Sequence, residues 1–228
     1  MWAFIVLIAL VAGLILFLFW QKQNQPHTGR RTVPPRSGAQ EKGQLGEQMV
    51  IDQCAQYFGD EYFLLNNSTF IDSTNGSSQI DHILISPYGI FVIETKHYAG
   101  LIFGTKKDHF WTQCLPNSKK SFQNPILQNK KHINVIAQLL KGHIAPHTLH
   151  SVIIFNGNSQ FKYPMPAHVL KGDQWIHYIK TFRTKIMSLD EVRKVYVYLE
   201  TMALPKTQET EDFHIQNLKR KYPEKARS

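Results

Sequence analysis

The stretch from Gln79 to Lys96 limits the possible folds of this chain more than any other, because it reads as two short strands around a turn. Ile80–Ser86 and Ile90–Glu94 are rich in β-branched and aromatic residues, and a Pro-Tyr-Gly break separates them. Apolar runs of this length and composition, divided by turn residues, are typical of a β-hairpin. A hairpin is therefore the first element that any fold of the chain has to contain.

The register of this hairpin places charged side chains together. If the Pro-Tyr pair forms the turn, Ser86 faces Gly89, and counting back puts Asp81 directly opposite Glu94. Lys96 follows two residues later and so lies on the same face as Glu94. Like charges directly opposite each other destabilise a sheet, so the pattern predicts a bound cation. The alternative is a solvated cross-strand cluster in which the lysine neutralises both acids.

The predicted cluster suits phosphodiester chemistry. Asp81 and Glu94 offer hard oxygen ligands of the kind that Mg²⁺ prefers, and the backbone carbonyl of Thr95 is a further candidate ligand. A bound Mg²⁺ or Mn²⁺ polarises a phosphoryl oxygen and lowers the pKa of water. Lys96 is predicted to orient or activate the attacking water and to stabilise developing negative charge. We therefore expect metal-assisted hydrolysis of a phosphodiester.

Composition limits the other possibilities. The formal net charge is +9, which favours an anionic partner, either nucleic acid or an acidic membrane surface, although a generally basic soluble surface is equally compatible. The two cysteines, Cys54 and Cys114, form no CxxC pair, which argues against a zinc site and a disulfide framework and favours buried thiols. No Walker A, GxGxxG or GxSxG string occurs, so nucleotide-dependent and serine-hydrolase functions lack support.

The amino-terminal segment predicts a membrane anchor. Trp2–Trp20 is uncharged and almost wholly apolar, and as a helix it would span roughly 28 Å, close to the hydrocarbon thickness of a bilayer. A cleaved signal peptide fits less well, because no basic segment precedes the run and no Ala-x-Ala site follows it. Lys22, Arg30, Arg31 and Arg36 follow the run, so the positive-inside rule places the rest of the chain in the cytoplasm. The chain is therefore expected to be a single-pass protein of a bacterial inner membrane.

The coarse order of elements predicts a mixed α/β domain with extensions. Its predicted elements are a helix over 41–58, strands near 62–65 and 68–70, the hairpin, a second strand pair at 101–103 and 110–114, a helix beginning at Asn124-Pro125, a buried strand at 151–155, a helix over 173–184 and a capped helix from Ser188 to Thr201. The expected parts are a transmembrane helix (1–20), a linker (21–40), the main domain (41–160), a strand and helical extension (161–204) and a basic polar tail (205–228).

The hairpin string Q-I-D-H-I-L-I-S-P-Y-G-I-F-V-I-E-T-K and the H-Y-A-G that follows it resemble the core of the NERD (nuclease-related domain) family. That family belongs to the PD-(D/E)XK, restriction-endonuclease-like superfamily. The resemblance extends upstream through G-Q-L-G-E at 43–47 and downstream through L-I-F-G, W-T-Q, N-P-I-L-Q and V-I-I-F. It covers roughly residues 41–160.

The resemblance implies a restriction-endonuclease-like core, a four-stranded mixed sheet flanked by helices. It implies that Asp81, Glu94 and Lys96 are the catalytic acid, acid and lysine. Glu47 matches an acidic residue on the first helix that helps to hold the metal. Ile80 stands where the superfamily motif has proline, a departure that NERD sequences commonly share.

Other residues are candidates for substrate contact. Gln113 and Gln128 match polar positions of the family. Exposed lysine pairs could contact a phosphate backbone without sequence preference, namely Lys106 with Lys107 and Lys119 with Lys120. Trp111 suits either a stacking platform or, more simply, the core. His82 and His97 are the histidines nearest to the predicted site.

The predicted function is that of a membrane-anchored, metal-dependent nuclease acting on nucleic acid, with DNA favoured by the superfamily resemblance. The alternative is a non-catalytic nucleic-acid-binding or membrane scaffold module on the same fold. A third reading is a structural membrane protein whose basic segments bind anionic lipid. The complete acid, acid and lysine set favours the enzyme, because a binding module has no need for opposed carboxylates.

Overall fold

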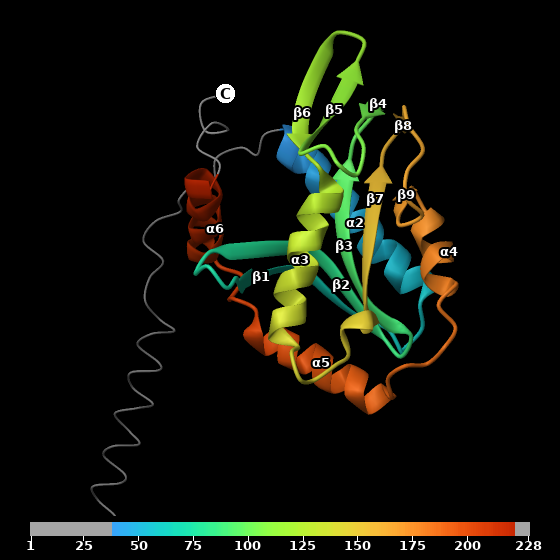
Figure 1. Cartoon of the computed structure of the whole chain (residues 1–228), viewed down its shortest axis with the longest axis vertical. Helices are drawn as coiled ribbons and strands as arrows, with labels where there is room; N and C mark the ends of the chain where they lie inside the picture. Colours follow the sequence, from blue (N-terminus) through green and yellow to red (C-terminus); the bar gives the residue numbers. More distant parts are fainter. Residues whose placement is uncertain (1–37, 222–228) are drawn as a thin grey trace, which may run out of the picture. The chain divides into compact units, whose positions relative to one another are not determined.

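The predicted hairpin lies at the centre of the fold. Its strands are β2 (Ser77–Ser86) and β3 (Gly89–His97), and they belong to a five-stranded mixed sheet with the order β1-β2-β3-β7-β9 (Figure 1). The computed structural model of the chain describes residues 38–221. These residues combine helices with short strands, which is the mixed α/β content that the sequence predicts.

The remaining elements follow in chain order. The helices are α2 (Gly38–Tyr57), α3 (Pro125–Leu139), α4 (Gln174–Lys180), α5 (Leu189–Met202) and α6 (Gln208–Lys221), with one 3₁₀ turn, η1 (Pro146–Thr148). The other strands are β1 (Phe63–Ile71), β4 (Gly100–Phe103), β5 (Phe110–Leu115), β6 (Ser118–Gln123), β7 (Leu149–Asn156), β8 (Ser159–Phe161) and β9 (Val169–Lys171).

The register of the hairpin is the one that the turn predicts. Ser86 pairs with Gly89, and the antiparallel ladder continues to His82 opposite Ile93. Gly89 has φ +149°, and a Cβ at this position would lie 2.7 Å from Cδ2 of His150. Only glycine suits this corner, because the left-handed conformation and the neighbouring ring both exclude a side chain. The turn therefore fixes which face of each strand carries the charged residues.

β3 and β7 are parallel neighbours, from Ile90 opposite Leu149 to His97 opposite Asn156. Parallel strands need a long crossover connection. Here the crossover contains β4, β5, β6 and α3. Its three strands join β8, which follows β7, in a second sheet with the order β6-β5-β4-β8. The prediction of a single four-stranded sheet was therefore wrong. The described residues form two mixed sheets, one with five strands and one with four.

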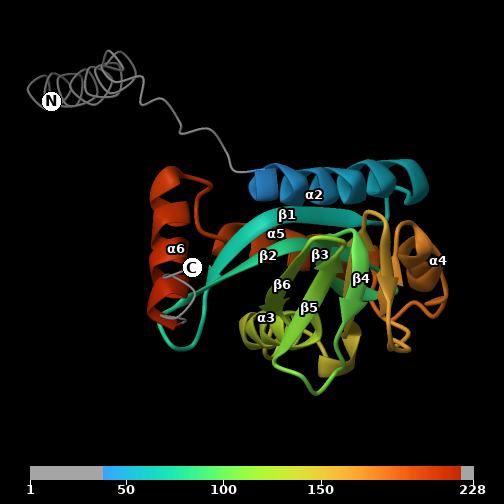
Figure 2. The same ribbon diagram turned by 90° about the horizontal axis from the view of Figure 1, so that it is seen from above.

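Helices cover both faces of the five-stranded sheet (Figure 2). On one face, Val92 and Ile83 pack against Ile136 of α3 and residues of α5. On the other, Phe91 and Ile93 pack against α2 and α4. Strands buried on both faces read as continuous apolar runs, which explains why the hairpin sequence shows so little polar alternation. The result is a three-layer α/β/α arrangement.

The second sheet joins this core through Trp111 on β5. The indole ring is fully buried and stacks on Phe155 of β7 with ring centroids 6.0 Å apart. Its Nε1–H donates to the carbonyl of Thr105 at 2.9 Å. A Cβ on Gly104 would lie 2.2 Å from the ring, so the backbone passes directly against it. Trp111 is therefore a core residue and offers no stacking platform.

α3 begins where the sequence predicts. The side chain of Asn124 accepts a hydrogen bond from the backbone N–H of Ile126 at 2.9 Å, and Pro125 occupies the first helical position. One turn later, the amide of Asn129 donates to the backbone carbonyl of Val92 at 2.8 Å and to Ser151 Oγ at 2.8 Å. Asn129 is fully buried. It therefore ties α3 to both parallel strands, β3 and β7.

Several predicted boundaries differ from the structure. The helix expected over 173–184 is only the seven residues of α4, while the capping box of Ser188 and Glu191 opens α5 as predicted. The segment expected as a polar tail forms α6, and α2 begins at Gly38, inside the expected linker. The strand β6, with the sequence S-K-K-S-F-Q, was not predicted because four of its six side chains are exposed and polar.

Within residues 38–221, no helix combines the length and the apolar character that crossing a membrane requires. The predicted transmembrane helix at 2–20 and most of the predicted linker lie outside the described residues.

Candidate functional site

Glu94 and Lys96 meet at the end of β3. The carboxylate of Glu94 is 1% exposed, and the ammonium of Lys96 binds its Oε1 directly. The two residues are separated by one position on a strand, so their side chains emerge on the same face. The predicted adjacency of the second acid and the lysine is therefore present.

Asp81 lies on β2 beside this pair, but its carboxylate turns toward the backbone of the neighbouring strand. Its Oδ2 accepts hydrogen bonds from the backbone N–H of Thr95 at 2.7 Å and from Thr95 Oγ1 at 2.8 Å. Thr95 was predicted only as a source of a carbonyl ligand. Its N–H and hydroxyl also have a role, because they fix the position of the Asp81 carboxylate.

Glu47 reaches the site because α2 approaches the ends of β3 and β7 closely. The preceding residue, Gly46, has no side chain, and a Cβ there would lie 3.1 Å from Cβ of His97. The carbonyl of Gly46 accepts a hydrogen bond from Asn156 Nδ2 on β7 at 3.0 Å. Glu47 is half-buried and is electrostatically coupled to both Glu94 and Lys96. Glycine at 46 is thus what lets this helix carry an acid to the site.

α3 contributes two side chains from one of its faces. Gln128 Oε1 accepts a hydrogen bond from Lys96 Nζ at 3.2 Å. His132, one turn further on, places Nε2 3.2 Å from Glu94 Oε2, at ion-pair distance but outside hydrogen-bond alignment. The other ring nitrogen, Nδ1, lies 2.8 Å from Ser78 Oγ. Ser78, His132 and Glu94 therefore form a buried chain of polar contacts.

His132 and Ser78 are site residues that the sequence reasoning missed. A usable signal existed for His132, because it follows Gln128 by four residues and so lies on the same face of α3. No local signal marks Ser78, which is 54 residues from His132 in the chain.

The ionisation of the site reflects burial and crowding of charge. Burial opposes the ionisation of Glu94, but Lys96 and His132 outweigh it and hold the pKa of Glu94 below its usual value. Burial, reinforced by the Glu94 carboxylate, raises the pKa of Asp81 to about 7. Burial likewise raises the pKa of Glu47, with Glu94 adding to the effect. Burial alone would lower the pKa of Lys96, but Glu94 and Asp81 raise it above its ordinary value.

The donor set fits a hard cation such as Mg²⁺. Both acids on the hairpin supply carboxylate oxygens, and Glu94 Oε2 is buried without a hydrogen bond. The pKa of Asp81 is raised chiefly by burial and then by the Glu94 carboxylate, and a bound cation would oppose both effects because it favours the ionised form. Among residues 38–221, no three His, Cys, Asp or Glu side chains are gathered as a ready-made metal cluster. The arrangement is therefore a pair of carboxylates with a third, Glu47, nearby.

The other predicted contact residues lie around the second sheet. Gln113 on β5 donates from Nε2 to the carbonyl of Ala99 at 2.7 Å, so its amide is already used within the fold. The predicted lysines are all exposed: Lys106 and Lys107 precede β5, and Lys119 and Lys120 lie on β6. Lys120 pairs directly with Gln113 across the ladder.

His82 and His97, the histidines closest in sequence to the hairpin acids, differ from His132 in their contacts. His82 is buried, and its Nδ1 lies 2.8 Å from Asn66 Oδ1. Burial lowers the pKa of His82 to about 4, so its ring is neutral near pH 7. The ring of His97 lies against Gly46. In this arrangement neither contacts the carboxylates of the hairpin through a hydrogen bond or ion pair that the structure describes.

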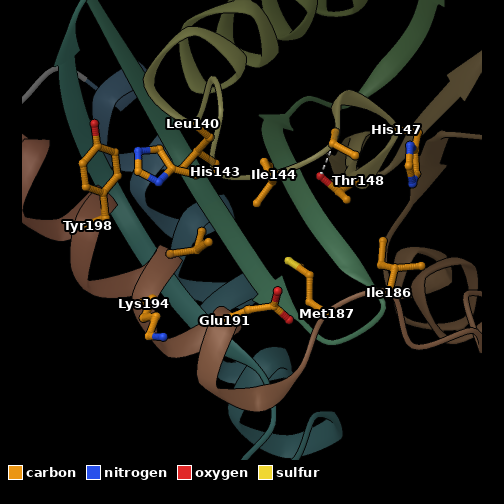
Figure 3. A pocket seen from close by; sticks show the side chains of 12 residues that line it. Leu140, His143, Ile144, His147, Thr148, Ile186, Met187, Glu191, Lys194 and Tyr198 are labelled. Atoms are coloured by element: carbon orange, nitrogen blue, oxygen red, sulfur yellow. Dashed lines mark hydrogen bonds between the residues drawn. The ribbon is translucent and has the colours of Figure 1, made fainter.

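A cavity of about 540 Å³ lies elsewhere, between the end of α3 and α5 (Figure 3). Its walls include Leu140, Met187 and Val195, with His143 and Tyr198 at one side. None of the predicted site residues lines it. The carboxylates and this cavity are therefore separate features.

The fold and site together define a class of protein. A mixed α/β domain with an acid, an acid and a lysine at the end of its central hairpin is the arrangement expected of a nuclease-related domain. The chain belongs to the NERD family: residues 42–156, just over half of the chain, match the family described as Nuclease-related domain. It is also similar to an uncharacterized protein of Bacillus anthracis, at 35% identity over 161 residues, which cover 68% of this chain and 74% of that protein. No solved structure matched the chain.

Proposed function

We propose that this protein is a nuclease that hydrolyses phosphodiester bonds of nucleic acid, with DNA as the substrate and Mg²⁺ or Mn²⁺ as the cofactor. The observation that carries the proposal is the meeting of Asp81, Glu94 and Lys96 at the end of the central hairpin. Opposed, partly buried carboxylates are costly in a sheet. A binding module would gain nothing from keeping them.

Asp81 and Glu94 would hold the metal, with the Thr95 carbonyl and Glu47 as further ligands. A bound divalent ion supplies polarisation of the phosphoryl oxygen and a lowered pKa for water. The chain itself orients these ligands. The N–H and hydroxyl of Thr95 hold Asp81, and Lys96 and His132 flank Glu94.

Of the two roles predicted for Lys96, activation of water and stabilisation of negative charge, its raised pKa favours the second. Its neighbours Glu94 and Asp81 keep the amine protonated at neutral pH. An ammonium group donates hydrogen bonds and stabilises negative charge, but it cannot accept a proton from water. Lys96 therefore serves as a cation for the reacting phosphate. Gln128 positions it by accepting one of its hydrogen bonds at 3.2 Å.

The exposed lysines of the second sheet supply sequence-independent contacts to phosphates on this proposal. Lys106 and Lys107 lie before β5, and Lys119 and Lys120 on β6. Gln113 stands at the same ladder. These groups are on the segment that connects β3 to α3, which are the two elements that carry Glu94, Lys96 and Gln128.

The proposal extends to location. The apolar run 2–20 would anchor the protein in a bacterial inner membrane as a single pass, and the positive charge that follows it would keep the domain in the cytoplasm. A reporter fused after Ser228 should give a cytoplasmic signal. An external signal would contradict this placement.

The test of the nuclease function uses the full chain in mild detergent with labelled DNA or RNA, and with Mg²⁺, Mn²⁺ or EDTA. We expect cleavage of DNA with either metal and none with EDTA. Asp81→Asn, Glu94→Gln and Lys96→Ala should each abolish cleavage, whereas Lys194→Ala, an exposed lysine on α5, should cleave like the wild type. Equal cleavage by the site variants and the wild type would refute the assignment.

The competing function is a non-catalytic nucleic-acid-binding module. The direct contact between the Lys96 ammonium and Glu94 Oε1 favours it, because an ion pair satisfies the carboxylate without a metal. Binding of nucleic acid without cleavage under either metal would establish this alternative.

A further inference from the structure

A polar cleft of about 400 Å³ opens beside the candidate site, between α3, the β1–β2 turn and α6. Two of its lining residues contact the site directly. Gln128 accepts a hydrogen bond from Lys96, and His132 lies 3.2 Å from Glu94. At one end of the cleft, a single layer of side chains therefore separates it from Glu94 and Lys96.

One face of α3 forms the first wall. From Gln128 the lining continues through Lys131 and Val135 to Gln138, with Asn134 beside them. These positions recur at helical spacing, so they line the cleft over roughly 15 Å of helix. Amides and a lysine are groups that bind phosphate oxygens.

α6 forms the opposite wall, where Figure 1 shows it beyond the ends of β1 and β2. The ring Nδ1 of His214 lies 2.9 Å from Ser77 Oγ, and Asn217 Nδ2 donates to the same oxygen at 3.3 Å. Exposed cations, Lys219 and Arg220, follow on the last turn. This helix lies outside the family match at 42–156. Its first half carries Glu209, Glu211 and Asp212, so α6 contributes the polar ring of His214 to the cleft rather than net positive charge.

The composition of the cleft suits a phosphodiester backbone. Its lining, as far as the described residues form it, contains no Phe, Tyr or Trp, so bases are not held by stacking on these rings. Asp72, an acidic residue of the lining, accepts hydrogen bonds from Thr74 and Gly76 within its own turn. The described lining is therefore mostly hydroxyls and amides, with Lys131 as its one Lys or Arg side chain.

We propose that this cleft holds one strand of nucleic acid by its phosphodiester backbone and leads it to Glu94 and Lys96. A cleft of about 400 Å³ corresponds to a cube with an edge of roughly 7 Å, so it cannot enclose both strands of a double helix, whose major groove alone is about 12 Å wide. The preferred substrate is therefore single-stranded or locally unpaired nucleic acid, read without sequence preference. This inference rests on the proposed nuclease function, which concerns the same site.

The test measures binding apart from cleavage. Full chain in mild detergent is titrated, with EDTA present, against a fluorescein-labelled single strand and the blunt duplex of the same sequence. The cleft variant combines Asn134→Asp with Gln138→Glu, which are near-isosteric changes at two exposed positions of α3. The matched control combines Gln56→Glu with Gln160→Glu, which changes the net charge equally at exposed positions of α2 and β8 that do not line the cleft.

We expect tighter binding of the single strand than of the duplex. The cleft variant should bind the single strand about fivefold more weakly for each added charge, the scale for unit charges 4 Å apart in water, and the control should stay within about twofold because distant exposed charges are screened. Lys131→Gln should reduce the slope of log affinity against log salt by about 0.7.

The two proposals can fail separately. Metal-dependent cleavage by the wild type, with equal single-strand binding by the cleft variant and the control, would overturn the cleft and leave the nuclease intact. Cleft-dependent binding of a single strand without cleavage would support the cleft and remove the nuclease. Tighter binding of the blunt duplex than of the single strand would overturn the inference.

Discussion

Replacing Lys96 by alanine should lower the free energy of unfolding, in addition to its expected effect on cleavage. The ammonium of Lys96 is the cation in direct contact with Glu94 Oε1, and the glutamate is 1% exposed. Its removal leaves a buried carboxylate whose remaining close partner is the ring of His132. An uncompensated buried charge is among the few single-residue changes that cost several kcal/mol.

The size of the loss follows from the burial of the pair. Breaking a buried ion pair by removing one partner costs about 3–5 kcal/mol. Lys96 is 16% exposed and His132 still faces the other carboxylate oxygen, so the lower end, about 3 kcal/mol, applies. For a domain of this size that loss lowers Tm by about 6–12 °C.

The loss should depend on pH in a defined direction. In the wild type the pKa of Glu94 lies below 4.5, so its ionised form contributes stability above that pH. Without Lys96, burial raises the pKa of Glu94, and its ionised form then opposes folding. The difference between wild type and variant should be largest near about pH 8 and should shrink as the pH falls toward about 4.5.

Thermal unfolding of the full chain, followed by near-ultraviolet circular dichroism at several pH values, measures this difference. Lys185→Ala is the matched control, because Lys185 is 64% exposed and lies 3.7 Å from Glu61. Exposed pairs contribute about 0–1 kcal/mol, so this control should move Tm by at most about 4 °C. Equal losses for the two variants, or a loss for Lys96→Ala that is the same at every pH, would refute the reasoning.

Three further changes have defined outcomes. His132→Ala should raise the Mg²⁺ concentration needed for half-maximal cleavage by about tenfold or more, the range for residues that orient a metal ligand; an unchanged requirement would leave His132 a packing residue. Because the pKa of Asp81 is raised to about 7, its contribution to metal-free stability is lost as the pH rises from 3.8 through that value. Calorimetry should therefore show Mg²⁺ binding that tightens between about pH 6 and about pH 8, and Asp81→Asn should abolish that dependence. Asn124→Ala removes the cap of α3 and the two hydrogen bonds that the Asn124 amide donates to the carbonyls of Thr105 and Asp108. It should therefore cost about 2–4 kcal/mol in urea unfolding; a loss below about 1 kcal/mol would contradict this count.

The hairpin could be predicted from sequence because its information is local. Apolar runs, a Pro-Tyr turn and a glycine at 89 fix both the element and the register. The alternation of side chains along β3 brings Lys96 to Glu94. The caps of α3 and α5 were predictable for the same reason, since the residues at 124 and 188 bond to their own first turns. Hydrogen bonds between residues that are close in the chain can be recognised from the sequence of a short segment.

The parts that escaped prediction depend on distant contacts. β8 has three residues, too short for a periodic signal, and it forms a strand only by pairing with β4. β9 is equally short, but it is the strand expected in the extension 161–204, and it pairs with β7. α6 is polar in sequence, and it is held to β2 through Ser77. Glu47 came from family resemblance, because its position depends on how closely Gly46 approaches His97. The position of each of these elements depends on tertiary contacts between residues that are far apart in the chain. A short stretch of sequence therefore does not reveal it.

The buried amide of Asn129 has a consequence for how the site comes into being. It binds the carbonyl of Val92 on one parallel strand and Ser151 on the other, which lies 22 residues further along the chain. α3 therefore settles in its final orientation only after β7 has paired, and parallel pairing between distant segments is a slow step of folding. Gln128 and His132 flank this amide on the same helix. A nascent chain that has not yet added β7 thus lacks this support for Lys96 and Glu94, and on the proposed function it should not cleave nucleic acid until β7 has paired.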